Sequence, residues 1–364
     1  MVACVAGLTL QLPQSFLPTS DSGYLGDLAW IALLVGCIIA VMAPLDFWGG
    51  YVAPLRFNRQ PISLGVFLKQ WSRGVLIQSL LFLISSIVIL IAGRQAGLTG
   101  ATVCVLIMSI LYVACQRRLL AAMTSGRWHA EDDKVDRSLE HAGSWNLKRL
   151  PVTVIHNMDP GFTGGVVGLP KFESIIIPRD FVDQLTAEQL AVVLARRLIA
   201  VESGGRTRGI LLALIWIVAG FIVSASLPGA GVITVAELVT TSMGFTVWTF
   251  LGLLTLPTIS RQSSYAIDAE LLRRGADTET FTQTIRALDS VQDDEPSRGA
   301  LVETIFHPVP SVDNRRQTHQ SGSPMAWHAA RMTLFLSWSC TGLLARAVHC
   351  NVGRPELWAM LPTD

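Results

Sequence analysis

The stretch TAEQLAVVLARRLIAVE, from Thr186 to Glu202, decides the fold of this chain because it predicts a helix with a well-marked beginning. Thr186 and Gln189 have the spacing of a capping box, in which each side chain accepts a hydrogen bond from a backbone N–H at the helix start. Apolar residues then recur at helical spacing and predict one buried face: Leu190, Val193, Leu194, Leu198 and Val201. Arg196 and Arg197 interrupt this pattern. Because apolar residues lie on most sides of the helix, we expect both arginines to be buried with partners.

The composition places this helix in a membrane protein. The chain has 364 residues, of which 51% are hydrophobic and 15% charged, and this is too apolar for an ordinary soluble protein. Five uncharged runs are long enough, or nearly so, for a bilayer that needs about 20 helical residues: 28–45, 74–93, 97–115, 209–236 and 238–260. The turn Leu227-Pro228-Gly229 and Glu237 break the last two runs apart, which predicts a tight hairpin.

The five runs divide the chain into successive parts. Residues 1–116 form a membrane region with three spans, 117–208 and 261–324 the two halves of a mixed α+β domain, 209–260 a transmembrane hairpin, and 325–364 a C-terminal apolar or interfacial helix and tail. In the first half, residues 152–155 and 174–177 are expected to form short strands. A sixth apolar run, residues 332–345, is short and bounded by arginines, so a span and a buried or interfacial helix both stay open.

The basic residues predict the orientation of the chain in the bilayer. Residues 1–27 contain no Lys or Arg, whereas residues 46–73 contain Arg56, Arg59, Lys69 and Arg73. Since basic loops stay in the cytoplasm, the N-terminus is expected outside. Five spans then place both halves of the α+β domain in the cytoplasm. The net charge of +1 argues against nucleic acid as a partner, because phosphate binding needs a concentrated basic surface.

Four segments occur in a fixed order between and after the spans. They are LPVTVIHNMDPGFTGG (150–165), FESIIIPRDFVDQLTAEQLAVVLARRL (172–198), YAIDAELLRRGAD (265–277) and HPVPSVDNRR (307–316). This series resembles the HtpX and CAAX-prenyl-protease family of membrane zinc metallopeptidases over about half of the chain. The resemblance implies a zincin-like α+β peptidase domain interleaved with transmembrane α-helices. It aligns residues 186–202 with the catalytic helix of that family.

The zinc-binding positions of that family are replaced in this sequence. Its H-E-x-x-H motif places two imidazoles one turn apart to bind zinc, and the glutamate polarises the attacking water. Arg196, Arg197 and Ala200 stand at those positions, and Ser264 stands where the third ligand, a glutamate, would be. Arginine stays protonated and offers no lone pair, so two arginines would repel a dication. We therefore predict no catalytic residue and no cofactor, with zinc bound only if the chain uses unrecognised ligands.

Other positions of the resemblance are retained. The aspartate at the place of Asp268 orients a zinc-bound histidine in the family, and here we expect it to pair with Arg196. Arg315 matches the downstream arginine and is expected in a second-shell or structural role. His307 is expected to shape a turn with Pro308.

Two further sets of residues have open alternatives. Gly161 and Phe162 match an edge strand that holds a peptide by backbone pairing, and a plain glycine loop is an equally open interpretation. Glu202 and Glu270 are carboxylates that could replace the lost ligands, but neither has a histidine at ligand spacing.

Three functions follow from these observations. The first is a pseudopeptidase that has lost hydrolysis and keeps a binding or scaffolding role toward membrane proteins or peptides. The second is an active membrane metalloendopeptidase with unrecognised ligands. The third is a structural subunit of a membrane complex, in which the peptidase-like fold serves only for packing.

Overall fold

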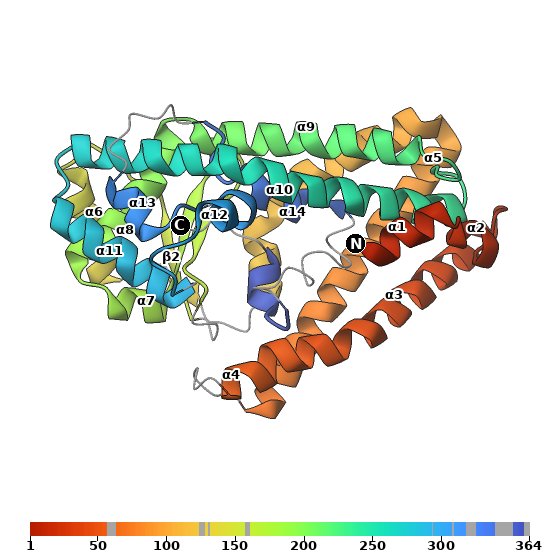
Figure 1. Ribbon diagram of the computed structural model, residues 1–364, viewed down its shortest axis with the longest axis horizontal. Helices are drawn as coiled ribbons and strands as arrows, with labels where there is room; N and C mark the ends of the chain where they lie inside the picture. Colours follow the sequence, from red (N-terminus) through yellow and green to blue (C-terminus); the bar gives the residue numbers. More distant parts are fainter. Residues whose placement is uncertain are drawn as a thin grey trace.

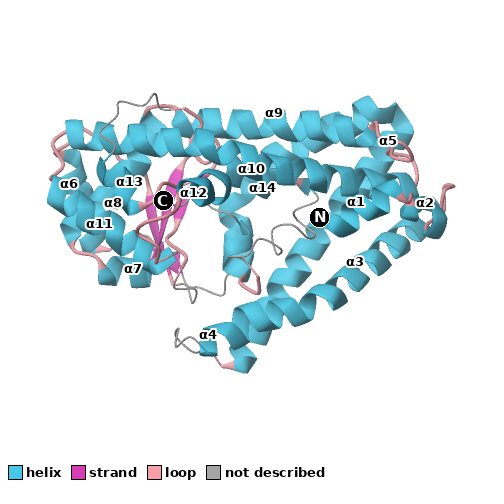
Figure 2. Cartoon of the chain, in the orientation of Figure 1, coloured by secondary structure: helices cyan, strands magenta, loops and turns pink. Residues whose placement is uncertain are grey.

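Long helices dominate the computed structural model, and a small sheet lies among shorter helices at one end of the molecule (Figures 1 and 2). The structure describes residues 1–56, 63–123, 128–129, 132–156, 161–292, 294–307, 309–317, 325–338 and 352–359. The short helices and the sheet form a compact domain, from which the long helices extend toward the opposite end (Figure 1).

Four helices in the described part of the chain are long and apolar enough to cross a membrane. The first is α3 (Gly23–Phe47), which continues through the π-helix η1 (Trp48–Val52) into α4 (Ala53–Arg56). The others are α5 (Leu64–Met123), α9 (Gly205–Ala225) and α10 (Val235–Arg273). Large apolar side chains project from α3 and α5 into the surroundings, among them Leu25, Leu33, Val41, Leu76 and Ile84. Such surfaces are stable in contact with lipid rather than water.

Helix α5 consists of two arms that meet at Ala96 and Gly97, where the backbone is not helical. Gly97 has φ +62°, a left-handed conformation that glycine adopts without strain. The hydroxyls of Ser85, 12 residues before Gly97, and Tyr112, 15 residues after it, lie 2.6 Å apart. The arms therefore run antiparallel, and the uncharged runs 74–93 and 97–115 lie one in each arm.

The turn Leu227-Pro228-Gly229 lies between α9 and α10 as expected, but Glu237 lies beyond the break. This residue does not break the apolar run but lies in the first turn of α10. Its backbone N–H donates to Thr234 Oγ1 (3.3 Å), and its carboxylate accepts from the Thr234 N–H (3.2 Å). The charge thus completes a capping box at a helix start, where it satisfies two otherwise unpaired donors. From there α10 continues to Arg273, so one helix carries both an apolar run and part of the candidate site.

The sheet has four strands in the order β1-β2-β4-β3. They are β1 (Trp128–His129), β2 (Val152–Ile155), β3 (Gly165–Val167) and β4 (Ser174–Pro178). The central strands β2 and β4 are parallel, and β1 and β3 pair with them antiparallel at the two edges. Strands occur at both expected places, because short β-branched runs between turn residues favour an extended backbone.

Five shorter helices accompany α8 (Ala187–Glu202) in this domain. They are α6 (Asp133–Gly143), α7 (Arg179–Gln184), α11 (Thr278–Gln292), α12 (Ala300–Phe306) and α13 (Val312–Gln317). Helix α8 packs against α6, α10 and α11, and all its residues from Leu190 to Ala200 are buried. The expectation of a single buried face was therefore wrong. Residues of the sheet and of α6, α7, α10, α11 and α13 share one apolar cluster with α8, so the helix is enclosed on every side along this stretch.

The ends of the chain pack against the long helices. Helices α1 (Val2–Thr9) and α2 (Leu12–Phe16) contact α10, and η3 (Pro355–Ala359) contacts α5. Helix α14 (Ala329–Leu336) is buried and packs against α9 and α10. With only 8 residues, α14 is too short to span a bilayer, so the described part of the run 332–345 forms a buried helix. Residues 339–345 lie outside the described residues.

Candidate functional site: a buried arginine cluster

The beginning of α8 confirms the capping box expected from the sequence. The Gln189 N–H donates to Thr186 Oγ1 at 3.2 Å, and the Gln189 side-chain oxygen accepts from the Thr186 N–H at 3.0 Å. This cap fixes where the helix starts and therefore which side chains face each neighbour. Arg196 and Arg197 lie in the second half of the helix, in the enclosed part, and both are fully buried.

Arg196 is paired with Asp268, as the sequence predicts. Its Nε donates to Asp268 Oδ1 at 2.7 Å, which joins α8 to α10 across their contact. The Asp268 side chain is 5% exposed and that of Arg196 is 0% exposed. Burying a guanidinium and a carboxylate in such surroundings is costly unless the two are paired and hydrogen-bonded.

Arg315 shares the same carboxylate from the opposite direction. Its Nε donates to Asp268 Oδ2 at 2.8 Å and its Nη2 to Asp268 Oδ1 at 3.1 Å. Arg315 therefore makes a forked contact with the carboxylate. Helix α13 presents Arg315 with two donors toward the carboxylate, whereas Arg196 presents only its Nε. The Arg315 guanidinium also lies 5.7 Å from the centre of the Phe281 ring, within the range of a cation–π contact.

Arg197, which stands at the position of the family's glutamate, holds backbone carbonyl groups beside the sheet. Its Nη2 donates to the Thr163 carbonyl at 2.6 Å and its Nη1 to the Ile176 carbonyl at 3.3 Å. Gln292 adds a hydrogen bond to Thr163 Oγ1 at 3.0 Å. Arg197 thus ties α8 to β4 and to the segment before β3. The sequence predicted that Arg197 is buried with partners, but it gave no signal of which acceptors they are, because these are main-chain atoms.

Ala200 and Ser264 complete the replaced set, and both are fully buried. Ala200 offers no ligand atom, and the Ser264 hydroxyl faces the Ser260 carbonyl of its own helix at 3.5 Å. No three His, Cys, Asp or Glu side chains gather at one place among the residues that the structure describes. Two guanidinium groups beside one carboxylate do not fit zinc, since the ion needs about four lone-pair donors and a field that tolerates a dication.

The two carboxylates considered as replacement ligands have another partner. Arg274 donates to Glu202 Oε1 at 3.0 Å and to Glu270 Oε1 at 2.6 Å. These contacts link the ends of α8 and α10, and the hydrogen bond to Glu202 is the main cause that raises the pKa of Arg274. Both carboxylates are therefore engaged away from Ser264 and Arg196.

The resemblance matched Gly161 and Phe162 to an edge strand, but neither residue lies in a strand. The nearby edge strand is β3, which begins at Gly165, three residues after Phe162. Phe162 is only 3% exposed and belongs to an apolar cluster with Val75 and Leu120 of α5. Its ring therefore fills the contact between the sheet and α5. Gly161 lies just before it and is partly exposed.

His307 was expected to shape a turn with Pro308. It follows α12, and its backbone N–H donates to the Glu303 carbonyl at 3.3 Å. Pro308 lies outside the described residues. Arg206, at the start of α9, is buried and donates to the Gly168 carbonyl at 2.7 Å. Sequence reasoning missed Arg206, although an arginine at the start of a long apolar run is a recognisable signal for a buried partner.

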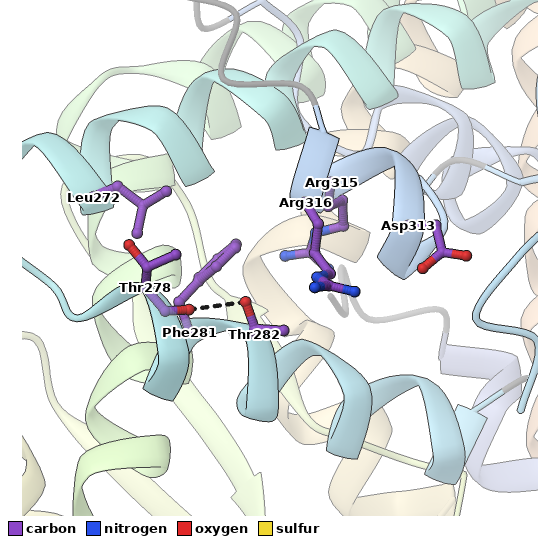
Figure 3. Close-up of a pocket in the computed structure, with 7 residues that line it drawn as sticks. All are labelled: Leu272, Thr278, Phe281, Thr282, Asp313, Arg315 and Arg316. Carbon is purple, nitrogen blue, oxygen red and sulfur yellow. Dashed lines mark hydrogen bonds between the residues drawn. The ribbon is translucent and has the colours of Figure 1, made fainter.

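A pocket of about 320 Å³ lies beside the cluster. Figure 3 shows Arg315 and Arg316 extending from α13 toward Phe281 and Thr282 on α11. Arg315 therefore borders the pocket and also holds Asp268. Arg315 therefore belongs both to the pocket lining and to the arginine cluster, which consists of Arg196, Arg197, Arg315 and Asp268.

Comparison with known proteins identifies the architecture. No family model matches the chain, and no curated protein matches it. Among solved structures, the crystal structure of Ste24p from S. mikatae matches with a TM-score of 0.68 and 12% sequence identity, over 86% of this chain and 78% of that chain. This likeness concerns the fold. Together with the long apolar helices, it supports an integral, multi-pass membrane protein with a Ste24p-like fold.

Proposed function

We propose that this chain is a membrane pseudopeptidase, which keeps the fold of a zinc peptidase and uses it for binding or scaffolding. The observation that carries the proposal is the hydrogen-bonded network of Arg196, Asp268 and Arg315. By the resemblance described above, Arg196 stands where the first zinc-binding histidine would be. A peptidase of this class needs a metal-bound water and a general base at that place, and guanidinium groups supply neither.

The electrostatics of the cluster support this proposal. Arg196, Arg197 and Arg315 are buried, and the Asp268 carboxylate pairs with Arg196 and Arg315. A dication placed there would be repelled by the guanidinium groups at short range in a medium of low dielectric constant. The donors of Arg197 point to backbone carbonyls, which gives this residue a role in packing rather than in water activation.

The proposal extends to partners and orientation. We expect contacts with the bilayer and with a membrane protein or peptide, and none with nucleic acid, because the net charge is +1. The distribution of basic residues supports an N-terminus outside and a peptidase-like domain in the cytoplasm. Without hydrolysis, the peptidase-like domain would serve as a rigid binding surface for a partner protein or peptide beside the membrane.

Metal analysis of the purified protein tests the central claim. The wild-type chain, loaded with zinc and washed with a chelator, is expected to retain no stoichiometric zinc. The variant Arg196→His, Arg197→Glu, Ala200→His, Ser264→Glu restores the ligand types of the family and should retain about one zinc per chain. A matched control keeps Ala200 and makes the other three changes, and it should bind zinc far more weakly because one ligand is missing.

The opposite result would favour another function. Retention of about one zinc per wild-type chain, lost after Ser264→Ala or Asp268→Ala, would support an active metalloendopeptidase with unrecognised ligands. Recovery of the zinc-free chain with one defined partner in fixed proportion would instead favour a structural subunit of a membrane complex.

A further inference from the structure

The hairpin of β3 and β4 ends in a tip that is unusually apolar for a surface turn. The tip consists of Leu169, Pro170, Lys171 and Phe172, and the Phe172 N–H donates to the Leu169 carbonyl at 2.9 Å. Turns that face water are usually built from Gly, Pro, Asn, Asp and Ser, and only Pro170 belongs to that set. Phe172 is 81% exposed, so most of its ring surface is left for a partner outside the chain.

The backbone of the tip presents Lys171 in a conformation that favours glycine. Its φ is +74°, and in a turn with proline at the second position, a third residue with positive φ is normally Gly or Asn. A lysine there strains the backbone, and such strained positions cluster at functional sites. Arg206 Nη1 lies 3.8 Å from Glu173 Oε1 and both side chains are buried, so these two charges offset each other. Lys171 therefore gives the tip a net positive charge.

The structure places the tip at the level where α9 enters the membrane. Arg206, in the first turn of α9, donates to the Gly168 carbonyl at 2.7 Å. Helix α9 has 21 residues and is therefore about 30 Å long, which is close to the thickness of the hydrocarbon core of a bilayer. Its first turn thus lies at one boundary of the bilayer, and Gly168, which directly precedes the tip, lies there with it.

Leu169 joins the tip to the membrane helices. It packs against an apolar cluster that includes Ile210 of α9 and Leu336 of α14. On α9 itself, Leu211 and Ile215 are 56% and 58% exposed, as expected of side chains that face lipid rather than water. The tip is therefore continuous with the lipid-facing part of the molecule, since one of its residues packs among the membrane helices and the next ones are exposed beside them.

We propose that residues 169–172 form a membrane-interface anchor that binds an acidic phospholipid in the leaflet beside the peptidase-like domain. The Phe172 ring enters the boundary between headgroups and acyl chains, where aromatic side chains are enriched in membrane proteins. The Lys171 ammonium, at the end of a long flexible side chain, pairs with the lipid phosphate. The anchor fixes the hairpin against the bilayer, and it does not depend on whether the chain has lost peptidase chemistry.

Photo-cross-linking of the full-length protein tests this proposal. p-Benzoylphenylalanine, which keeps an aromatic ring, replaces Phe172, and the protein is placed in nanodiscs of mixed phosphatidylcholine and phosphatidylglycerol. After illumination, mass spectrometry should show phospholipid attached at position 172. The attached lipid should be enriched at least about twofold in phosphatidylglycerol over the bulk mixture, because a lysine at the surface attracts acidic headgroups.

The same probe at position 183 is the control for location. Asp183 is 64% exposed and lies in α7, which follows the opposite end of β4 from the tip. A probe there should take up no phospholipid. Equal uptake at positions 172 and 183 would show that the reaction is unspecific and would overturn the proposal.

A pair of charge reversals tests the role of Lys171, with the probe kept at position 172. Lys171→Glu should lower the phosphatidylglycerol share of the attached lipid to that of the bulk mixture or below, since the acidic headgroup is then repelled. Arg137→Glu changes an exposed residue of α6, at the end of the domain away from the long helices (Figure 1), and should leave the enrichment unchanged. Thermal melting in nanodiscs shows whether both variants remain folded.

Three other results would overturn the proposal. The first is the absence of attached lipid at position 172. The second is attachment of position 172 to another protein or to a second copy of this chain, which would make the tip a protein-binding surface. The third is a phosphatidylglycerol share that equals the bulk value or that does not change in folded Lys171→Glu.

Discussion

At the scale of single residues, the Asp268 carboxylate is the anion that pairs with two buried arginines. It accepts hydrogen bonds from Arg196 and Arg315 at 2.7 to 3.1 Å, and all three side chains are at most 5% exposed. The net stabilisation by such a network is small, because desolvation of the ions offsets their attraction. The loss of one member is nevertheless costly, since the remaining charges stay inside.

We predict that Asp268→Ala lowers the free energy of unfolding by about 3 to 5 kcal/mol, the usual cost of breaking a buried ion pair. Denaturant titration in detergent micelles measures this change. Asp183→Ala is the matched control, because Asp183 is 64% exposed and lies 3.9 Å from Arg179. Exposed pairs contribute less than about 1 kcal/mol, and an equally small effect at Asp268 would contradict the importance of the network.

A second prediction concerns Arg197 and the sheet edge. Arg197→Met removes the donors to the Thr163 and Ile176 carbonyls and should cost about 1 to 3 kcal/mol, because buried acceptors lose their partners. Hydrogen exchange followed by mass spectrometry should become faster in peptides that cover β3. Exchange in α6, which lies on another side of α8, serves as the internal reference, and uniform acceleration in both elements would contradict a local role.

At the scale of elements, helix starts show how few residues can fix a structure. Helices α8 and α10 both begin with a capping box, and α11 begins after Asp277. The Asp277 carboxylate accepts hydrogen bonds from the Thr280 N–H at 2.7 Å and from the Thr280 hydroxyl at 2.8 Å. The backbone hydrogen bond is the main cause that lowers the pKa of Asp277 below its usual 3.8, because the bonded state favours the ionised carboxylate.

This lowered pKa predicts acid sensitivity at the beginning of α11. A group with a depressed folded-state pKa stabilises the fold above its unfolded pKa, and this contribution disappears as the pH falls through the folded pKa. The difference in helix protection between the wild type and Asp277→Ala should therefore be complete at pH 6, should begin to fall near pH 4 and should vanish only below the folded-state pKa, which is lower. Hydrogen exchange of α11 between pH 6 and pH 3 measures it, and a gap that does not change with pH would rule out a role for the carboxylate charge.

At the scale of the whole molecule, α10 joins the membrane region to the candidate site. The helix carries an apolar run in its first part and Asp268 near its end. Helix α14 fills the space beside α9 and α10.

The proposed orientation gives a prediction at this scale. In a background without the six native cysteines, Ser20→Cys should react with an impermeant reagent added outside intact cells, and Ser290→Cys should not. Both residues are exposed, so access is decided by the side of the membrane, as the distribution of basic residues predicts. Labelling of both positions after permeabilisation is the control. Labelling of Ser290→Cys in intact cells would reverse the proposed orientation.

The amino-acid sequence by itself determined the features that depend on a few neighbouring residues or on composition. It predicted the start of α8 from Thr186 and Gln189, the strands near residues 152–155 and 174–177, and the apolar helices. It also predicted the pair of Arg196 and Asp268, but only through the resemblance to a known family. Hydrogen-bond caps, β-branched runs and hydrophobic lengths act over short distances along the chain, so each leaves a readable pattern.

Only the tertiary structure decided which distant groups meet. Arg315 lies 47 residues after Asp268, and its forked contact depends on how α13 packs against α10. The acceptors of Arg197 are backbone carbonyls, which every residue possesses, so no residue type marks them in the sequence. The burial of α8 on all sides and the position of Phe162 against α5 likewise result from packing between elements. Side-chain partners across a core are set by the relative placement of whole helices and strands, and local sequence patterns do not encode that placement.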